Sequence, residues 1–190
     1  MNLKEIKEFK KKFPSRAFGI GHFTTTNNGI RRGLQFYDYD GSLNQQKLRK
    51  ILSIFPNDCI IYKSKNGFHF YSFTLIDSDL ARTRANGLTE SFNEIGDKQD
   101  YKSKTQLILR ISPKFLDNKI ISEETKFLKY IKLPVKNKFV SKTHLDFFLD
   151  FKELPKRIYY AYKYNSILVD ASLALNYYHT RNKEEVTKNK

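Results

Sequence analysis

Hydrophobic residues recur along the first half of the chain with two different periods, which predict a mixture of helices and strands. Apolar positions at helical spacing predict an opening helix over residues 1–13 and another over residues 77–95. Between them, Ser42 with Gln45 three residues later forms a capping box in front of a helical stripe that Pro56 ends. The pattern therefore predicts three helices in this half of the chain.

Apolar and β-branched runs predict strands between these helices. Two pairs of runs flank the turn signals Asn27-Asn28-Gly29 and Lys65-Asn66-Gly67, so each pair is predicted as a hairpin. The predicted strands are residues 17–26, 33–40, 59–64, 68–75 and 106–112. After the first helix the order is β-β-α-β-β-α-β. We expect an α+β fold in which helices pack on one side of a mixed or antiparallel sheet, with a helical C-terminus.

The last third of the chain has a weaker pattern. It is predicted as two strands, a terminal helix and a solvated tail over residues 126–133, 140–151, 159–178 and 182–190. A length of 190 residues suits one compact unit, so we expect residues 126–190 to form an extension packed on the same domain as residues 1–125.

Charge adds a candidate class of partner. The chain holds 35 Lys and Arg against 20 Asp and Glu, a net charge of +15, and residues 51–100 are more acidic than the segments on both sides. Such a field attracts polyanions, of which nucleic acid is the commonest. The candidate nucleic-acid contacts are Arg31, Arg32, Arg82 and Arg84. Solubility alone is the alternative explanation of this charge.

Cysteine content and hydropathy exclude several classes. With Cys59 as its one cysteine, the chain cannot form an internal disulfide or a thiolate zinc cluster. No apolar run approaches the length that spans a bilayer, and residues 1–13 are charged. We expect a cytoplasmic protein with no membrane partner.

A pair of carboxylates marks the predicted strand 33–40. Because side chains alternate across a strand, Asp38 and Asp40 project from one face, while Tyr37 and Tyr39 take the other. Two carboxylates about 7 Å apart repel each other unless a cation lies between them. Mg²⁺ or Mn²⁺ fits oxygen ligands of this kind. The alternative is structural, since Asp40-Gly41-Ser42 can also serve as a turn or helix cap.

The second predicted hairpin has a basic tip. Lys63, Ser64 and Lys65, together with backbone N–H groups at its glycine, can hold phosphate oxygens. His69 follows within an aromatic strand and can contact a triphosphate. The alternative is a surface turn followed by a half-buried histidine that bonds to a backbone carbonyl.

Together these two motifs resemble those of the archaeo-eukaryotic primase superfamily, the catalytic domains of primases and primase-polymerases. The first family motif is a hydrophobic strand ending in D-x-D, matched by Phe36-Tyr37-Asp38-Tyr39-Asp40. The second is a Ser or Thr, a glycine-containing turn and then His before hydrophobic residues, matched by Ser64-Lys65-Asn66-Gly67-Phe68-His69-Phe70-Tyr71. The resemblance covers about residues 17–112.

The resemblance implies a primase-like palm and a nucleotidyl transfer reaction. Asp38 and Asp40 would ligate the catalytic Mg²⁺ or Mn²⁺, and His69 would contact nucleotide phosphates with Ser64 and Lys65. The partners would be a DNA template or primer, nucleoside triphosphates and a helicase or replication accessory protein. The setting would be DNA replication, priming or repair, on a plasmid or virus given the small size.

The sequence departs from this family at one position. A third carboxylate normally comes from a later strand, but the best-fitting strand, residues 107–111, contains none. Arg110 within it can bind phosphate, whereas Asp97 and Asp100 lie outside the strand. This departure admits a relative that binds nucleotides without catalysis.

Two other functions are compatible with parts of the sequence. A rolling-circle replication initiator would use Tyr160 as nucleophile with Lys163 three residues later, but His69 lacks the second histidine that its metal site requires. A non-catalytic nucleic-acid-binding domain would stack bases on strand aromatics. Its candidate rings are Phe68, Phe70, Tyr37 and Tyr39.

Overall fold

The structure is a computed structural model of the 190-residue chain. It describes residues 3–13, 17–21, 23–25, 31–56, 58–92, 108–110, 112–116, 119–123, 125–131, 138–171 and 175–178. The helices are α1 (Leu3–Lys12), α2 (Gln45–Leu52), α3 (Ser78–Ser91), α4 (Lys142–Phe151) and α5 (Lys156–Asn165). The strands are β1 (Ala17–Gly21), β2 (Phe23–Thr25), β3 (Arg31–Asp40), β4 (Cys59–Lys63), β5 (Gly67–Ile76), β6 (Ile108–Arg110), β7 (Lys114–Leu116), β8 (Lys119–Ser122), β9 (Lys126–Ile131), β10 (Lys138–Ser141), β11 (Ser166–Val169) and β12 (Leu175–Tyr178).

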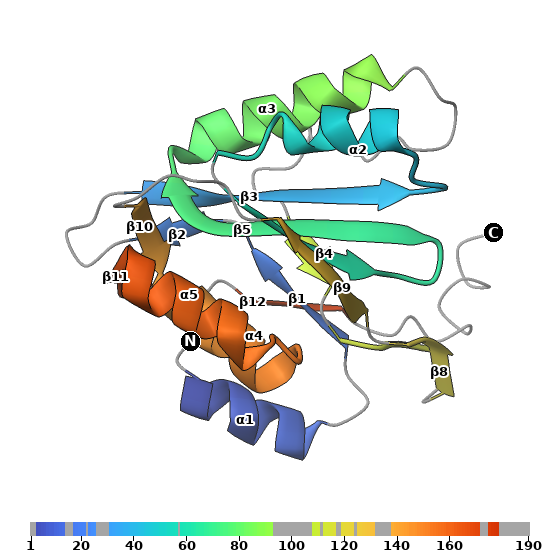
Figure 1. The fold of residues 1–190 in the computed structure, drawn as a ribbon. Helices are drawn as coiled ribbons and strands as arrows, with labels where there is room; N and C mark the ends of the chain where they lie inside the picture. Colours follow the sequence, from blue (N-terminus) through green and yellow to red (C-terminus); the bar gives the residue numbers. More distant parts are fainter. Residues whose placement is uncertain are drawn as a thin grey trace.

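A seven-stranded mixed sheet forms the centre of the molecule (Figure 1). The long strands β3 and β5 pair antiparallel, and β4 joins β5 to β9. Strand β2 extends the sheet beyond β3, while β10 pairs antiparallel with β5 and parallel with β11. The α+β class predicted from the sequence is therefore confirmed. The segment after residue 125 contributes β9, β10 and β11 to this sheet.

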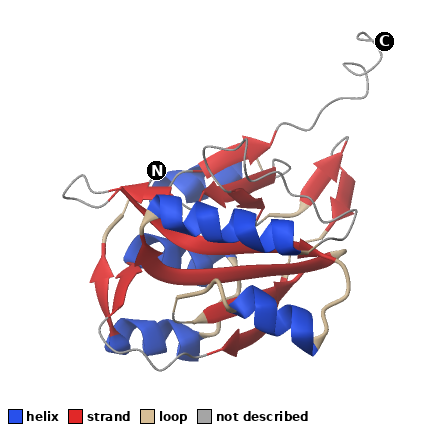
Figure 2. Ribbon diagram, turned by 90° about the horizontal axis from the view of Figure 1, so that it is seen from above, coloured by secondary structure: helices blue, strands red, loops and turns tan. Residues whose placement is uncertain are grey.

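Helices cover both faces of the central sheet, so the prediction of helices on one side is wrong. Helices α2 and α3 lie over one face, and α1, α4 and α5 lie beyond the other (Figure 1). Figure 2, seen from above the α2–α3 layer, shows helices lying over the strands. Each face has its own buried cluster, one around Tyr37 and Phe70 and one around Tyr71 and Phe148. Because both faces are buried, apolar or aromatic residues project from both faces of β3 and β5.

Helix α4, which packs on the second face of the sheet, lies in a segment that the sequence pattern predicted as a strand. Residues 140–151 form the end of β10 and then α4. Ser141 caps this helix, because its side chain accepts a hydrogen bond from the backbone N–H of His144. His144, Leu145, Phe147 and Phe148 are buried. Their spacing is helical, which explains why the segment does not continue as a strand.

Other predicted elements have different bounds in the structure. Strand β1 pairs with β6 and β12 in a separate three-stranded sheet, so it is not part of the β2–β3 hairpin. Helix α2 begins at Gln45, and its cap lies two residues after the predicted one, because Asn44 rather than Ser42 accepts the capping hydrogen bond from Lys47 N–H at 2.8 Å. The predicted C-terminal helix ends at Asn165 and continues into β11. The predicted tail, residues 182–190, lies outside the described residues.

A buried ion pair joins β10 to the residue that precedes β4. Lys138 donates a hydrogen bond to Asp58, and Ser72 Oγ donates to Asp58 Oδ1 at 2.9 Å. Burial and the nearby Asp58 charge raise the pKa of Tyr130 to about 12 and hold that of Tyr162 well above its usual value. Asp58 and Lys138 are therefore compensated charges inside the core beside protonated phenols.

In the part of the chain that the structure describes, none of the helices has the length and hydropathy of a membrane span.

Candidate functional site

Asp38 and His69 form the centre of the candidate site. They occupy directly opposed positions on β3 and β5, and Asp38 Oδ1 lies 3.3 Å from His69 Nε2. Alternation along β3 places Tyr37 and Tyr39 in the cluster beneath α2 and α3, so Asp38 projects from the opposite face. His69 and Tyr71 share that face, and Tyr71 Oη lies 3.2 Å from His69 Nδ1. The sheet pairing thus brings together the acid and the imidazole that the sequence motifs predicted.

Asp40 lies two residues beyond Asp38 on the same strand, at an exposed position opposite Gly67. The absence of a side chain at Gly67 permits a close approach of the strands, since a Cβ there would lie 1.8 Å from the Tyr39 carbonyl oxygen. Gly41 N–H donates to the Asn66 carbonyl at 2.9 Å, which fixes the hairpin tip beside the end of β3. Local geometry therefore holds both carboxylates at one end of the sheet.

The imidazole of His69 is neutral over the ordinary pH range. Its exposed fraction is 4%. Burial, together with the positive charges of Lys152 and Arg110, lowers the pKa of His69 to about 3. Because carboxylates accept only, the compatible tautomer has Nε2–H facing Asp38 and Nδ1 accepting from the Tyr71 hydroxyl. His69 can thus act as a fixed neutral donor.

Lys152 is a site residue that the sequence analysis missed. It follows α4 and is 2% exposed, and its ammonium donates to Thr125 Oγ1 and lies 5.3 Å from the centre of the Tyr62 ring. Its charge acts on His69 across the sheet face. Nothing in the local sequence distinguishes it from the many surface lysines, because its position depends on how α4 packs. A buried cation near an acid and an imidazole creates positive potential in a low-dielectric setting.

Arg110, predicted as a phosphate contact, supplies the second cation. It lies on β6, which pairs with β1 rather than with the central sheet, and its guanidinium donates to the Ser112 carbonyl at 2.5 Å. Its positive charge also lowers the pKa of His69. Asp97 and Asp100 fall outside the described residues.

The predicted phosphate-binding residues of the hairpin are distributed over two faces. Ser64 Oγ accepts from Gly67 N–H at 2.9 Å, so it shapes the turn. Lys63 follows the buried Tyr62 on the opposite side of β4, and its ammonium lies 4.0 Å from the centre of the Phe68 ring, on the α2–α3 side. Lys65 is exposed at the tip. Of these side chains, the structure places Lys63 away from His69.

The predicted nucleic-acid contacts are not gathered at this site. Arg31 and Arg32 begin β3, at the opposite end from Asp38, and Arg32 is exposed. Arg82 and Arg84 belong to α3, on the other side of the sheet, where Arg82 pairs with Asp79 at 3.1 Å. Arg84 donates to the Ile54 carbonyl at 3.4 Å.

The strand aromatics proposed as base-stacking rings lie mostly in the core. Tyr37, Tyr39 and Phe70 are at most 1% exposed, so they cannot stack bases, and Phe68 packs partly against the same cluster. The rings that are accessible lie elsewhere. Tyr160, predicted as a nucleophile for the alternative initiator function, is exposed on α5 beside Tyr164.

The donor atoms at the site fit a divalent cation in part. Asp38 and Asp40 offer carboxylate oxygens from one strand face, the ligand type that Mg²⁺ and Mn²⁺ prefer. Over the described ranges, no cluster of three or more His, Cys, Asp or Glu side chains could hold a metal ion. These two acids therefore suit an ion that completes its shell with substrate phosphates and water, as Mg²⁺ commonly does.

Comparisons of the chain with protein-family models, curated proteins and solved structures found no match.

Proposed function

We propose that this protein is a metal-dependent nucleotidyltransferase of primase-polymerase type, which binds a nucleoside triphosphate on the Asp38–His69 face of the sheet. The supporting observation is that an acid, a buried neutral imidazole and two cations act on one another there. Asp38 and Asp40 provide anionic ligands, and Lys152 with Arg110 provides positive charge suited to phosphates. A D-x-D strand end followed by Ser64 and His69 supports the same assignment at the level of resemblance.

Each residue has a distinct role in this proposal. Asp38 and Asp40 would hold Mg²⁺ or Mn²⁺, and the bound ion would stabilise negative charge on the attacking and leaving oxygens of phosphoryl transfer. Once Asp38 ligates the ion, the Nε2–H of His69 that faces Asp38 would be available to a phosphate oxygen, while the Tyr71 hydroxyl holds Nδ1 and fixes the tautomer. Lys152 and Arg110 would offset the charge of the triphosphate. The product would be a primer strand, synthesised or extended during DNA replication with an accessory protein such as a helicase.

A nucleotide incorporation assay tests this proposal. Wild-type protein is incubated with a single-stranded template, with and without a primer, and with triphosphates and Mn²⁺ or Mg²⁺. We expect dinucleotide formation or primer extension, and a loss of at least about 100-fold for Asp38→Ala and Asp40→Ala because each removes an ion ligand. Asp79→Ala on α3 is the matched control, since it removes an exposed carboxylate on the other side of the sheet.

The result has three informative outcomes. Incorporation by wild type that depends on both Asp38 and Asp40 but not on Asp79 supports the proposal. Incorporation that survives Asp38→Ala contradicts the assigned site. Triphosphate binding without any incorporation contradicts the catalytic part and favours a binding-only relative.

A further inference from the structure

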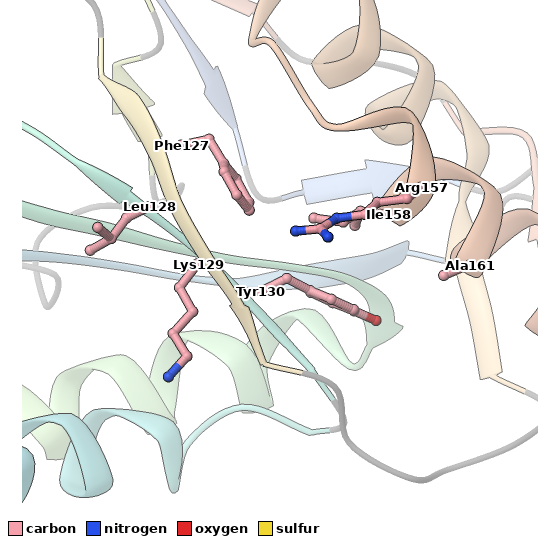
Figure 3. Close-up of a pocket in the computed structure, with 7 residues that line it drawn as sticks. All are labelled: Phe127, Leu128, Lys129, Tyr130, Arg157, Ile158 and Ala161. Atoms are coloured by element: carbon pink, nitrogen blue, oxygen red, sulfur yellow. The ribbon is translucent and has the colours of Figure 1, made fainter.

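A pocket of about 360 Å³ lies between β9 and α5, on the same sheet face as Asp38. Figure 3 shows the rings of Phe127 and Tyr130 and the guanidinium of Arg157 directed into the space between the strand and the helix. Ile158 and Ala161 line its helical side. Two aromatic rings and a guanidinium in an open pocket provide the surfaces on which a flat nucleobase stacks.

A β-bulge explains why both rings point the same way. Tyr62 on β4 is opposite Phe127, whereas Ile61 is opposite Lys129, so Leu128 is an extra residue on β9. In a regular strand, Phe127 and Tyr130, three residues apart, would fall on opposite faces. With the extra residue, both pack toward the cluster around Tyr71, while Leu128 stays 52% exposed. The bulge therefore creates the aromatic lining.

Next to this pocket, α5 carries a pair of exposed aromatic side chains. Tyr160 and Tyr164 are 45% and 76% exposed, and their rings stack with centroids 5.9 Å apart and planes 18° from parallel. Tyr159 contacts this pair, since its ring centroid lies 5.6 Å from that of Tyr160, and its hydroxyl donates to Asp146 at 2.9 Å. At helical spacing, Arg157, Ala161 and Tyr164 follow one another along a single stripe. The Tyr160–Tyr164 pair thus adjoins the pocket.

The charge of α5 suits a polyanion. The helix contains Lys156, Arg157 and Lys163 and no acidic residue. Lys156 and Lys163 lie on the far side of the tyrosine pair from the pocket by helical spacing, so cations flank the exposed rings on both sides. Aromatic rings between flanking cations are the arrangement by which proteins hold single-stranded nucleic acid.

Buried aromatic contacts connect the pocket to the Asp38–His69 face. The Phe127 ring lies 6.0 Å from that of Tyr62, whose ring lies 5.6 Å from Tyr71, the partner of His69. Strands β9, β4, β5 and β3 are consecutive neighbours, so β9 and β3 are about 14 Å apart at a spacing of about 4.8 Å per strand. A single-stranded nucleic acid bound on α5 would therefore lie within a few nucleotides of the proposed triphosphate site.

We infer that the β9–α5 pocket and the Tyr160–Tyr164 pair form a binding site for single-stranded nucleic acid. One unstacked base enters the pocket between Phe127, Tyr130 and Arg157, and the neighbouring base stacks on the exposed tyrosine pair. Lys156 and Lys163 contact the phosphates. This inference rests on the proposed function for its biological meaning, because the strand would be the template or primer of that reaction.

Fluorescence anisotropy measures oligonucleotide binding at this site without metal or triphosphate, so the result is independent of nucleotidyl transfer. The probe is a labelled oligothymidylate of about 12 nucleotides, within the site sizes of single-strand binders. We expect Tyr164→Ala to weaken binding by at least about fivefold, and Tyr160→Ala with Tyr164→Ala by more, because base stacking on each ring is lost. Tyr164→Phe and Tyr164→Trp retain a ring and should bind within about twofold of wild type.

Two controls separate stacking from charge and from misfolding. Phe139→Ala removes a ring that is 54% exposed on β10, between the values for Tyr160 and Tyr164, and should leave affinity within about twofold. An abasic oligomer of the same length keeps the phosphates but offers no bases, so it should bind more weakly and be insensitive to Tyr164→Ala. The chain has no tryptophan. In Tyr164→Trp the new residue is therefore the sole indole, and base stacking should quench its emission.

The inference is contradicted if the double tyrosine variant binds oligothymidylate as wild type does, or if the abasic oligomer binds equally well. If Phe139→Ala weakened oligothymidylate binding as much as the tyrosine variants do, the nucleic acid would not bind specifically on α5. Tyr160→Phe also tests the initiator alternative. If wild type forms a covalent adduct with single-stranded DNA and Tyr160→Phe does not, Tyr160 acts as a nucleophile and not as a stacking ring. If this site binds DNA but no incorporation occurs, the inferred binding site is supported and the proposed catalysis is contradicted.

Discussion

Asp38 and His69 face each other across β3 and β5, with 3.3 Å between Oδ1 and Nε2, on the sheet face opposite α2 and α3. The β3–β5 register pairs Asp38 with His69 and Asp40 with Gly67. Two motifs about 30 residues apart in sequence thus meet in adjacent strands. The juxtaposition gives the proposed site its polar centre.

The pKa of His69 predicts a pH dependence of stability. The native pKa is about 3 and the unfolded value about 6.5, so between these values the unfolded state binds a proton that the native state does not. The free energy of unfolding should therefore fall as the pH drops below about 6.5. Between about pH 7 and pH 5, wild type should lose about 2 kcal/mol more than His69→Gln. Urea unfolding of both proteins at the two pH values measures the difference; equal losses would show that His69 is not buried as described.

Lys152 should control both the imidazole and the binding of anions. Replacing it with Met keeps the length of the side chain but removes the buried charge, so the pKa of His69 should rise in Lys152→Met and stay low in Lys152→Arg. An NMR titration of the histidine ring measures this shift. Triphosphate affinity should fall by roughly 10- to 100-fold in Lys152→Met, the range of a charged hydrogen bond. An unaltered His69 pKa in that variant would place Lys152 outside the site.

Gly67 should be intolerant of any side chain. A Cβ at this position would lie 1.8 Å from the Tyr39 carbonyl oxygen, so Gly67→Ala must separate β5 from β3 beside Asp40. We expect a loss of more than about 2 kcal/mol in the free energy of unfolding. Gly87→Ala is the matched control, because it has open space around the new Cβ in α3 and should stabilise by up to about 1 kcal/mol. Thermal or urea unfolding of the two variants compares them, and similar effects would argue against the close approach.

The buried pair of Asp58 and Lys138 should show strong coupling. Lys138→Met leaves Asp58 buried without its cation and should cost about 3–5 kcal/mol, whereas the double variant with Asp58→Asn should recover much of that loss. Lys7→Met tests the exposed pair of Lys7 and Asp150 and should cost at most about 1 kcal/mol. A double-mutant cycle by urea unfolding measures the coupling. Additive effects would mean that the two side chains do not interact in solution.

The local patterns of the sequence were sufficient for the hairpin that carries His69 and for the strand that carries Asp38. In this hairpin, β4 and β5 flank a clear turn signal and are rich in β-forming residues. Their bounds therefore agree with the predicted ones to within about two residues. The shared face of Asp38 and Asp40 followed from alternation alone. The pairing of Asp38 with His69 required in addition that β3 and β5 be neighbours in the observed register.

What the sequence did not reveal depends on packing between distant segments. Lys152 reaches the site because α4 lies across the second face, and α4 itself was predicted as a strand. The aromatic lining on β9 depends on a bulge at Leu128, which has no glycine to signal it. Tyr37, Tyr39 and Phe70 are candidate base-stacking rings by sequence, but they are buried in the cluster beneath α2 and α3. In each case a tertiary contact decides which face of an element is accessible.

Binding of a non-hydrolysable nucleoside triphosphate in the presence of Mn²⁺ tests the central claim most directly. Isothermal titration of wild type should reveal one site whose affinity depends on Mn²⁺, and the Asp38→Asn/Asp40→Asn variant should lose that dependence while keeping its fold by circular dichroism. Absence of binding to wild type, or equal Mn²⁺-dependent binding to the double variant, would contradict the assignment of Asp38 and Asp40 to a triphosphate site.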